Sequence, residues 1–256
     1  MGRTRAAGRG SRVREVRAAP APEAGGTPGG PEVDVGAETV TVLLLRHAHV
    51  LGHRGDVPIT DEGHEQARRA GAWIGSAGYD VGAVLYGGTR RTRETAEGIV
   101  DGLGAGGSRR TAVLDSFALR NPDLYVGGER VSMVSTAAAF AEQTTTLTAD
   151  DVSRVPFFQE WLAHPERVGF WVAHPSPPGD TAAAVARRIL AFAESLADVP
   201  AWRGRTIVAV THSPVLRALG LQRHGVDPGE PALVTGYQLS VGSGSVGIED
   251  VAPATS

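Results

Sequence analysis

Continuous runs of apolar residues predict the strands of this chain. Residues 39–45 read TVTVLLL, residues 81–86 read VGAVLY and residues 206–211 read TIVAVT. Such runs are rich in β-branched and aliphatic side chains and lack polar alternation, which is typical of strands buried on both faces of a sheet. Shorter runs at residues 111–115 and about 234–241 predict two more strands.

Amphipathic segments between these runs predict helices. Residues 60–77 begin at Thr60, a good helix N-cap, and residues 89–103 and 214–223 each follow a predicted strand. Residues 180–197 show the clearest pattern, with one apolar stripe made by Val185, Ile189, Phe192 and Leu196. Strands that alternate with helices predict an α/β fold, with three α/β/α layers around a mostly parallel central sheet.

One long stretch, about residues 116–178, interrupts this alternation. Its two or three helical pieces, broken by proline and glycine, predict a helical cap inserted into a domain that spans residues 38–250, followed by a C-terminal tail at 251–256. The stretch holds most of the aromatic residues of the chain: Tyr125, Phe140, Phe157, Phe158, Trp161, Phe170 and Trp171. We expect most of them to form a small satellite core, and an aromatic cap that selects the organic part of a ligand is the functional alternative.

Residues 1–37 differ in composition from the rest of the chain. They are rich in Arg, Gly, Ala and Pro and hold almost no large apolar side chains. Such a segment cannot bury enough surface to offset its loss of conformational entropy, so we predict a disordered tail. The tail lacks the apolar stretch of a signal peptide, and no run approaches the roughly 18 apolar residues that span a membrane.

Composition removes several classes of chemistry. The 256 residues include no cysteine, and every basic residue is arginine because lysine is absent. Cysteine nucleophiles, thiolate metal sites, lysine Schiff bases and P-loop lysines are therefore excluded. A phosphate site in this chain has to use arginine, histidine and backbone N–H groups. A net charge of −3 gives no general attraction to nucleic acid or to an anionic membrane.

The residues that can carry chemistry follow three of the predicted strands. Arg46 and His47 end the first strand, Arg91 follows the second, and His212 follows the strand at 206–211. Ligands of open α/β sheets bind beyond the carboxyl ends of the strands, so these side chains are expected to converge on one edge. A neutral imidazole attacks phosphorus when arginines neutralise the phosphate oxygens, and a second histidine stabilises the developing charge. The set predicts phosphoryl transfer through a phosphohistidine.

Five motifs occur in order along the chain: LLLRHAHV, DVPITDEGHEQARRAG, TRRTRETAE, PPGDTAAAVARRIL and VAVTHSPVLRAL. Together, over about residues 40–222, they resemble the histidine phosphatase superfamily, branch 1, the phosphoglycerate-mutase-like branch. The resemblance implies that His47 is the nucleophile, that Arg46 and Arg91 bind the phosphoryl group, and that His212 is the second histidine of the pocket. Arg91 is preferred over the neighbouring arginines because its spacing to the following Thr-Ala pair matches the family pattern.

The chain departs from the family pattern at three places. Ala48 replaces the usual glycine after the nucleophile, which is a mild change. Val50 and His53 replace a threonine and an asparagine, and His53 is a candidate phosphate ligand, with a surface-loop histidine as the alternative. Asn121 stands where the family generally places a glutamate, and an amide cannot transfer a proton.

A phosphatase of this type needs a proton donor for the leaving oxygen and a base for the attacking water. Asp123 is the first candidate, because Pro122 stiffens the turn that presents it. Asp115 and Glu129 are the other candidates, and Asp123 can also be a turn former or a helix cap. Without a donor, either the leaving group needs little acid assistance or the activity is low.

The expected function is metal-independent hydrolysis of a phosphate monoester of a small molecule, without a cofactor, through a phosphohistidine on His47. Three alternatives stay open. One is a phosphomutase, although the segment typical of glycolytic mutases is missing. Another is a non-catalytic domain that binds phosphate esters and lacks the usual acid. The third is a metallohydrolase that uses His47, His49 and His53.

The expected partner is a small-molecule phosphate ester, and we expect no nucleic acid and no membrane. We expect a cytoplasmic location, with a homodimer as one candidate assembly. The absence of lysine and the heavy use of Ala, Gly and Arg suggest a GC-rich bacterial genome. Substrate identity is left open, because one fold serves many substrates.

Overall fold

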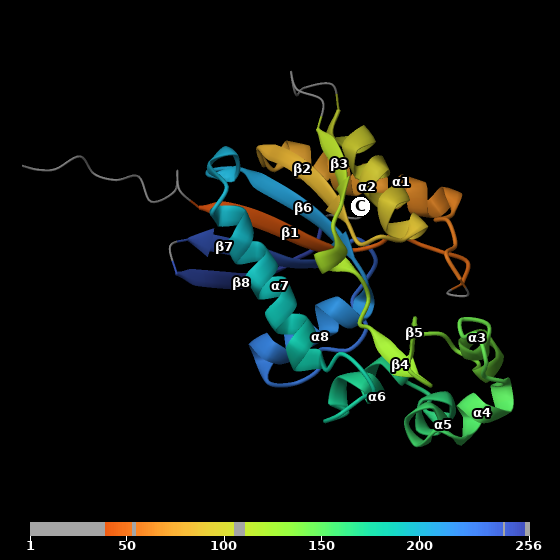
Figure 1. Cartoon of the computed structure of the whole chain (residues 1–256). Helices are drawn as coiled ribbons and strands as arrows, with labels where there is room; N and C mark the ends of the chain where they lie inside the picture. The colour runs from red at the N-terminus through yellow and green to blue at the C-terminus, as the bar shows by residue number, and fades with distance from the viewer. Residues whose placement is uncertain (1–38, 53–54, 105–110, 243, 254–256) are drawn as a thin grey trace, which may run out of the picture. The chain divides into compact units, whose positions relative to one another are not determined.

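A six-stranded sheet forms the centre of the computed structural model, which describes residues 39–52, 55–104, 111–242 and 244–253. Its strands are β1 (Val40–Arg46), β2 (Val81–Tyr86), β3 (Ala112–Asp115), β6 (Thr206–Thr211), β7 (Gly236–Gly242) and β8 (Ser245–Val251). Their order is β3-β2-β6-β1-β7-β8 (Figure 1). The first four in this order are parallel, whereas β7 runs antiparallel to both β1 and β8. The mostly parallel sheet is confirmed.

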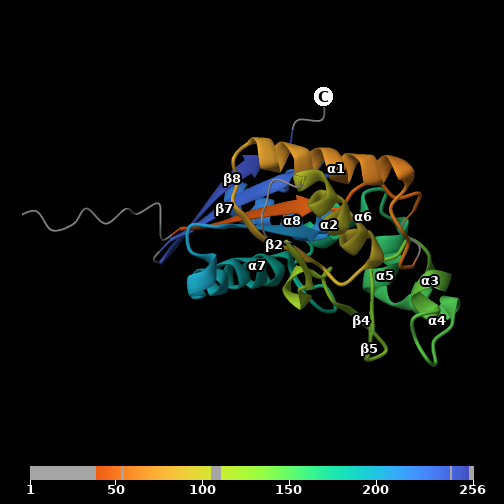
Figure 2. The same ribbon diagram turned by 90° about the horizontal axis from the view of Figure 1, so that it is seen from above.

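Helices cover both faces of the sheet, so the predicted three layers are also confirmed. The four long helices are α1 (Asp61–Ser76), α2 (Arg90–Leu103), α7 (Ala182–Ala197) and α8 (Ser213–His224). In β1, Leu43 and Leu45 pack in the apolar cluster of α1 and α2, whereas Val42 and Leu44 pack in the cluster of α7 and α8. Figure 2 shows the first pair of helices on one side of the sheet and α7 on the other. Burial on both faces explains the uninterrupted apolar run of this strand.

The long insertion between β3 and α7 is richer in structure than the sequence indicated. It holds the 3-10 helix η2 (Phe117–Leu119), the hairpin β4 (Leu124–Val126) and β5 (Glu129–Val131), and helices α3 (Ala137–Ala141), α4 (Ala149–Arg154), α5 (Pro156–Ala163) and α6 (Arg167–Ala173). A second 3-10 helix, η3 (Pro200–Trp202), follows α7. The prediction of two or three helical pieces missed the hairpin, because its strands are only three residues long. We call this insertion the cap.

The aromatic residues of the cap do not form a separate satellite core. Phe140, Phe158, Trp161 and Trp171 are buried and belong to the same apolar cluster as the α7 and α8 face of the sheet. The indole N–H of Trp171 donates to the carbonyl of Asp180 at 2.9 Å, just before α7 begins. The cap is therefore built onto the main core.

The C-terminal end of the chain contains a strand that the sequence did not reveal. β8 pairs with β7 at the edge of the sheet, and most of its residues are exposed or half-buried. Its apolar signal is weak for that reason, and Val251, predicted to open the C-terminal tail, is its last residue. The predicted tail at residues 1–37 lies outside the described residues. Within the described ranges, no helix has the length and apolar character needed to cross a bilayer.

Candidate active site

Two histidines lie side by side where neighbouring parallel strands end. The sheet register pairs Arg46 of β1 with Thr211 of β6, and the backbone N–H of His47 donates to the carbonyl of Thr211 at 3.0 Å. His47 and His212 are 3% and 1% exposed. Their ring centroids are 5.6 Å apart, and the ring planes meet at 65°. Parallel pairing thus brings together two histidines that are far apart in the sequence.

The neighbours of the two rings indicate which nitrogen carries the proton in each neutral imidazole. Nδ1 of His47 lies 2.8 Å from the carbonyl oxygen of Ala48, which can only accept, so Nδ1 carries the proton and Nε2 keeps its lone pair. Nδ1 of His212 lies 3.4 Å from Nη2 of Arg91, which can only donate, so the proton of His212 is on Nε2. One ring therefore offers a nucleophile and the other a donor.

Arg91 sits in the first turn of α2 and is held against the segment that follows His47. The hydroxyl of Thr95 donates to the carbonyl of Arg91 at 2.7 Å and accepts the backbone N–H of Ala48 at 3.0 Å. Arg91 is 8% exposed, and burial lowers the pKa of its guanidinium, while the charge of Asp56 opposes the shift. Its Nε is buried and has no hydrogen-bond partner in the described part of the protein. An anion at this position would satisfy the group.

Arg46 is the second arginine of the site, and its side chain is 11% exposed. Its Nη2 lies 2.6 Å from Oε1 of Glu230, and its Nη1 donates to the carbonyl of Pro231 at 2.5 Å. Burial lowers the pKa of Arg46, and the charge of Glu230 works in the opposite direction. Among the described residues, the buried Nε of Arg46 has no acceptor. The two arginines therefore each bring one unsatisfied N–H to the site.

A cavity of about 780 Å³ lies beyond the ends of β2 and β3. The first turn of α2 lines it with Arg91, the segment after β3 with Phe117 and Asn121, and the cap with residues such as Arg130 and Gln143. The turn between β2 and α2 needs glycine at position 87, where it passes close to η2. A Cβ there would lie 2.4 Å from the carbonyl oxygen of Leu119. The cavity is large enough for a small organic ligand.

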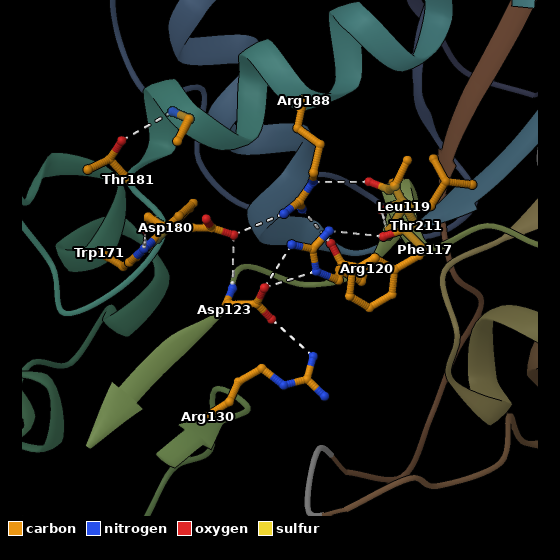
Figure 3. Close-up of polar contacts among 12 residues, drawn as sticks. Phe117, Leu119, Arg120, Asp123, Arg130, Trp171, Asp180, Thr181, Arg188 and Thr211 are labelled. Atoms are coloured by element: carbon orange, nitrogen blue, oxygen red, sulfur yellow. Dashed lines mark hydrogen bonds and ion pairs between the residues drawn. The ribbon is translucent and has the colours of Figure 1, made fainter. Parts of the chain in front are cut away.

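The surroundings of Asp123 stabilise its ionised form. Arg120 donates to Oδ2 through Nε at 3.0 Å and through Nη2 at 2.7 Å, and Arg130 donates to Oδ1 at 3.2 Å (Figure 3). Burial raises the pKa of Asp123, but the hydrogen bonds and charges of the two arginines outweigh it and hold the pKa below its usual value. The role of Asp123 as proton donor stays a prediction, and these contacts favour an anion over an acid.

The other two candidate acids have different surroundings. Asp115 ends β3 and lines the cavity, and its carboxylate makes no hydrogen bond or ion pair with the described residues. Glu129 accepts hydrogen bonds from the backbone N–H and the hydroxyl of Thr145 in the cap, at 2.9 and 3.1 Å. Asn121 faces the same cavity as Asp115, with a buried Oδ1 that no described donor reaches. Of the three carboxylates, Asp115 is the one available for proton transfer at the cavity.

His49, the other histidine of the first motif, contacts the N-cap of α1. Nδ1 of His49 lies 2.9 Å from the hydroxyl of Thr60, the N-cap of α1. His53, predicted as a phosphate ligand, lies outside the described residues. In the part of the chain that is described, no three His, Cys, Asp or Glu side chains gather closely enough to hold a metal ion.

Two acidic residues near the arginines were not singled out as site residues from the sequence. Asp56 accepts the backbone N–H of Arg90 at 2.7 Å, which places its charge at the start of α2 beside Arg91. Its place in the DVPITDEG motif was the available signal. Glu230 lies in the loop before β7, and no motif marks it.

Comparison with known proteins finds a family likeness for part of this chain. Residues 42–115 match the family model of the histidine phosphatase superfamily (branch 1), and that segment contains His47 and Arg91. This segment of the chain is therefore similar to the histidine phosphatase superfamily (branch 1). No curated protein matches it in sequence.

Solved structures show a likeness in fold that extends over most of the chain. Phosphoglycerate mutase from Bacillus anthracis aligns with a TM-score of 0.56 and 16% identity, covering 85% of this chain and 95% of the mutase. Mycobacterial hydrolase 1 aligns with a TM-score of 0.55 and 19% identity, covering 85% and 100%. Mycobacterial glucosyl-3-phosphoglycerate phosphatase in complex with VO3 aligns with a TM-score of 0.53 and 18% identity, covering 84% and 100%. At these identities the likeness establishes the fold.

Proposed function

We propose that this chain hydrolyses a phosphate monoester of a small molecule through a phosphohistidine on His47, without a metal ion. The observation that carries the proposal is the pairing of His47, whose Nε2 holds a lone pair, with His212, whose Nε2 carries a proton. Arg46 directly precedes His47, and Arg91 lies beside His212. This arrangement suits a phosphoryl group, because nucleophile, donor and cations meet at one place.

In the first step, Nε2 of His47 attacks phosphorus. The N–P bond forms while the bond from phosphorus to the ester oxygen breaks, and that oxygen leaves as an alcohol once it takes a proton. Arg46 and Arg91 neutralise the phosphoryl oxygens, and the Nε2 proton of His212 stabilises the charge that builds up on them. The hydrogen bond from Nδ1 to the carbonyl of Ala48 stabilises the cationic ring of phosphorylated His47.

In the second step, water attacks phosphorus and the N–P bond breaks, which releases inorganic phosphate and regenerates His47. We assign the proton transfers of both steps to Asp115, because it lines the cavity without a partner among the described residues. The substrate's organic group occupies the 780 Å³ cavity between Phe117 and the cap. A phosphatase of the same fold that is solved with VO3 supports an anion site of this kind.

Hydrolysis of 4-nitrophenyl phosphate in EDTA tests the proposal. Wild-type protein is expected to be active, and His47→Asn to lose at least about 1,000-fold, since removal of a catalytic nucleophile typically costs this much or more. His224→Asn is the matched control, because His224 is an exposed histidine at the end of α8. Activity that EDTA abolishes and zinc restores, or full activity of His47→Asn, contradicts the proposal.

A further inference from the structure

A single carboxylate connects the two strand ends that carry the histidines. Oε1 of Glu230 lies 2.6 Å from Nη2 of Arg46, the residue before His47. Oε2 of Glu230 accepts the hydroxyl of Ser213, the residue after His212, at 2.5 Å. Both oxygens are therefore engaged, although the side chain is 49% exposed. The bridge holds the end of β1 and the start of α8 at a fixed separation.

The loop that presents Glu230 is itself anchored. Arg217 of α8 is 2% exposed and pairs with Asp227 in this loop and with Glu166 at the start of α6. Burial opposes the charge of Arg217, but the two carboxylates raise its pKa above the usual range. Asp227 also accepts the backbone N–H of Gly229 at 3.1 Å, next to Glu230. The backbone at Glu230 is therefore held in place. This lowers the entropy cost of fixing the Glu230 side chain.

Glu230 and the carbonyl of Pro231 together fix the plane of the Arg46 guanidinium. Nη1 donates to the carbonyl of Pro231, and Nη2 forms an ion pair with Glu230. The buried Nε is left without an acceptor in the described part of the chain. A guanidinium held in this way offers its remaining donors in one orientation, as bidentate binding of a phosphoryl group requires.

We propose that Glu230 is a positioning residue, which orients Arg46 and Ser213 so that the phosphoryl site beside His47 and His212 is formed before ligand binds. The inference rests on the proposed function only in taking Arg46 as a phosphoryl ligand. Glu230 acts through Arg46 and does not itself contact the phosphoryl group, because a carboxylate and a phosphoryl group in contact repel each other.

A double-mutant cycle on anion affinity tests this role. The dissociation constant of inorganic phosphate is measured by calorimetry for wild type, Glu230→Ala, Arg46→Ala and the double variant. Glu230→Ala is expected to weaken binding roughly tenfold, about the worth of one charge-assisted hydrogen bond. In the Arg46→Ala background, the same substitution is expected to change binding less than about twofold, since coupled residues are not additive. Equal losses in both backgrounds, or no loss with Arg46 present, overturn the proposal.

Two further variants separate positioning from a general loss of structure. Glu230→Gln keeps an oxygen that can accept a hydrogen bond from Arg46 or Ser213, so it is expected to recover part of the affinity. Glu249→Ala removes an exposed carboxylate from β8 and is expected to bind phosphate like wild type. If Glu230→Gln is folded, as judged by thermal melting, but binds phosphate no better than Glu230→Ala, the positioning role is wrong.

The same measurements distinguish this inference from the proposed function. Phosphate affinity needs no turnover, so the Glu230–Arg46 coupling can be present in a protein that never forms phosphohistidine. Conversely, phosphohistidine formation with no coupling between these residues supports the function and overturns the positioning role. If both hold, kcat/KM for 4-nitrophenyl phosphate falls in Glu230→Ala by roughly 10- to 100-fold, because small misplacements of a ligand group cost this much.

Discussion

Hydrogen-bond partners give the two histidines different roles, although both follow buried strands. His47 faces the carbonyl of Ala48 and His212 faces Arg91, so their protons sit on different ring nitrogens. The sequence predicted that both histidines and the arginines meet, because each follows a strand whose carboxyl end reaches the same edge. It could not reveal Glu230, because a lone acid in a loop carries no periodicity or motif.

The contacts of single carboxylates distinguish the candidate proton donors. Asp115 faces the cavity without a partner in the described residues, whereas Asp123 is held as an anion by Arg120 and Arg130. We expect Asp115→Asn to slow hydrolysis of an alkyl phosphate by about 100-fold and that of 4-nitrophenyl phosphate far less, because a good leaving group needs little protonation. The ratio of kcat/KM for the two esters is the measurement.

Asp123→Asn is the matched variant for this test, since it makes the same change on the same cavity. We expect it to leave the ratio for the two esters near the wild-type value. A ratio that changes in Asp123→Asn and stays constant in Asp115→Asn would establish the assignment made from the sequence and refute the one made from the structure.

At the scale of elements, α7 fixes the wall of the cavity. Arg188 donates to the carbonyls of Ala118 and Arg120, at 3.1 and 2.8 Å, and pairs with Asp180 at 2.9 Å (Figure 3). Periodicity predicted this helix well, because its apolar stripe is long. The sequence did not show that Arg188 binds the chain on both sides of the cap, since these contacts span up to 70 residues.

Arg188→Ala is expected to lower the free energy of unfolding by about 2–4 kcal/mol, because it leaves two carbonyls and a carboxylate without their charged partner. Chemical denaturation is the measurement. Arg187→Ala serves as the control: its side chain is exposed on the same helix turn, and the expected change is within about 0.5 kcal/mol. Equal effects of the two substitutions would show that the Arg188 contacts contribute nothing.

At the scale of the whole molecule, ion pairs connect the cap, α8 and the loop before β7. Arg217 joins Glu166 to Asp227, and Arg120 joins Asp123 to the cavity wall. Alternation of strands and helices predicted the layers and the parallel core, since both follow from local apolar patterns. The apolar pattern did not predict β8 or the cap hairpin, because short or half-exposed strands contain too few consecutive apolar residues.

These pairs predict how stability depends on pH. The arginines hold the pKa values of Asp123, Glu166 and Asp227 below their ordinary values against the opposing effect of burial. A lowered folded-state pKa adds stability that is complete above the unfolded value of about 4 and is lost as the pH falls through the folded value. We therefore expect the melting temperature to be level from about pH 5 upward and to fall steeply below about pH 4.

Asp227→Asn is expected to reduce this acid dependence, because the amide cannot lose a proton in either state. Asp198→Asn, which changes an exposed aspartate after α7, is expected to keep the wild-type profile. Melting temperatures between pH 3 and pH 7 compare the three proteins. Parallel curves for wild type and Asp227→Asn would refute the contribution of the Arg217 pairs.

Trapping of the phosphorylated enzyme tests whether His47 carries the phosphoryl group during hydrolysis. The protein is mixed with 4-nitrophenyl phosphate, quenched within milliseconds at alkaline pH, where phosphohistidine survives, and analysed by peptide mass spectrometry. We expect one added phosphoryl group on the peptide that contains His47, and none in His47→Asn. Turnover that proceeds with no phosphorylated His47 peptide at any quench time would contradict the proposed function.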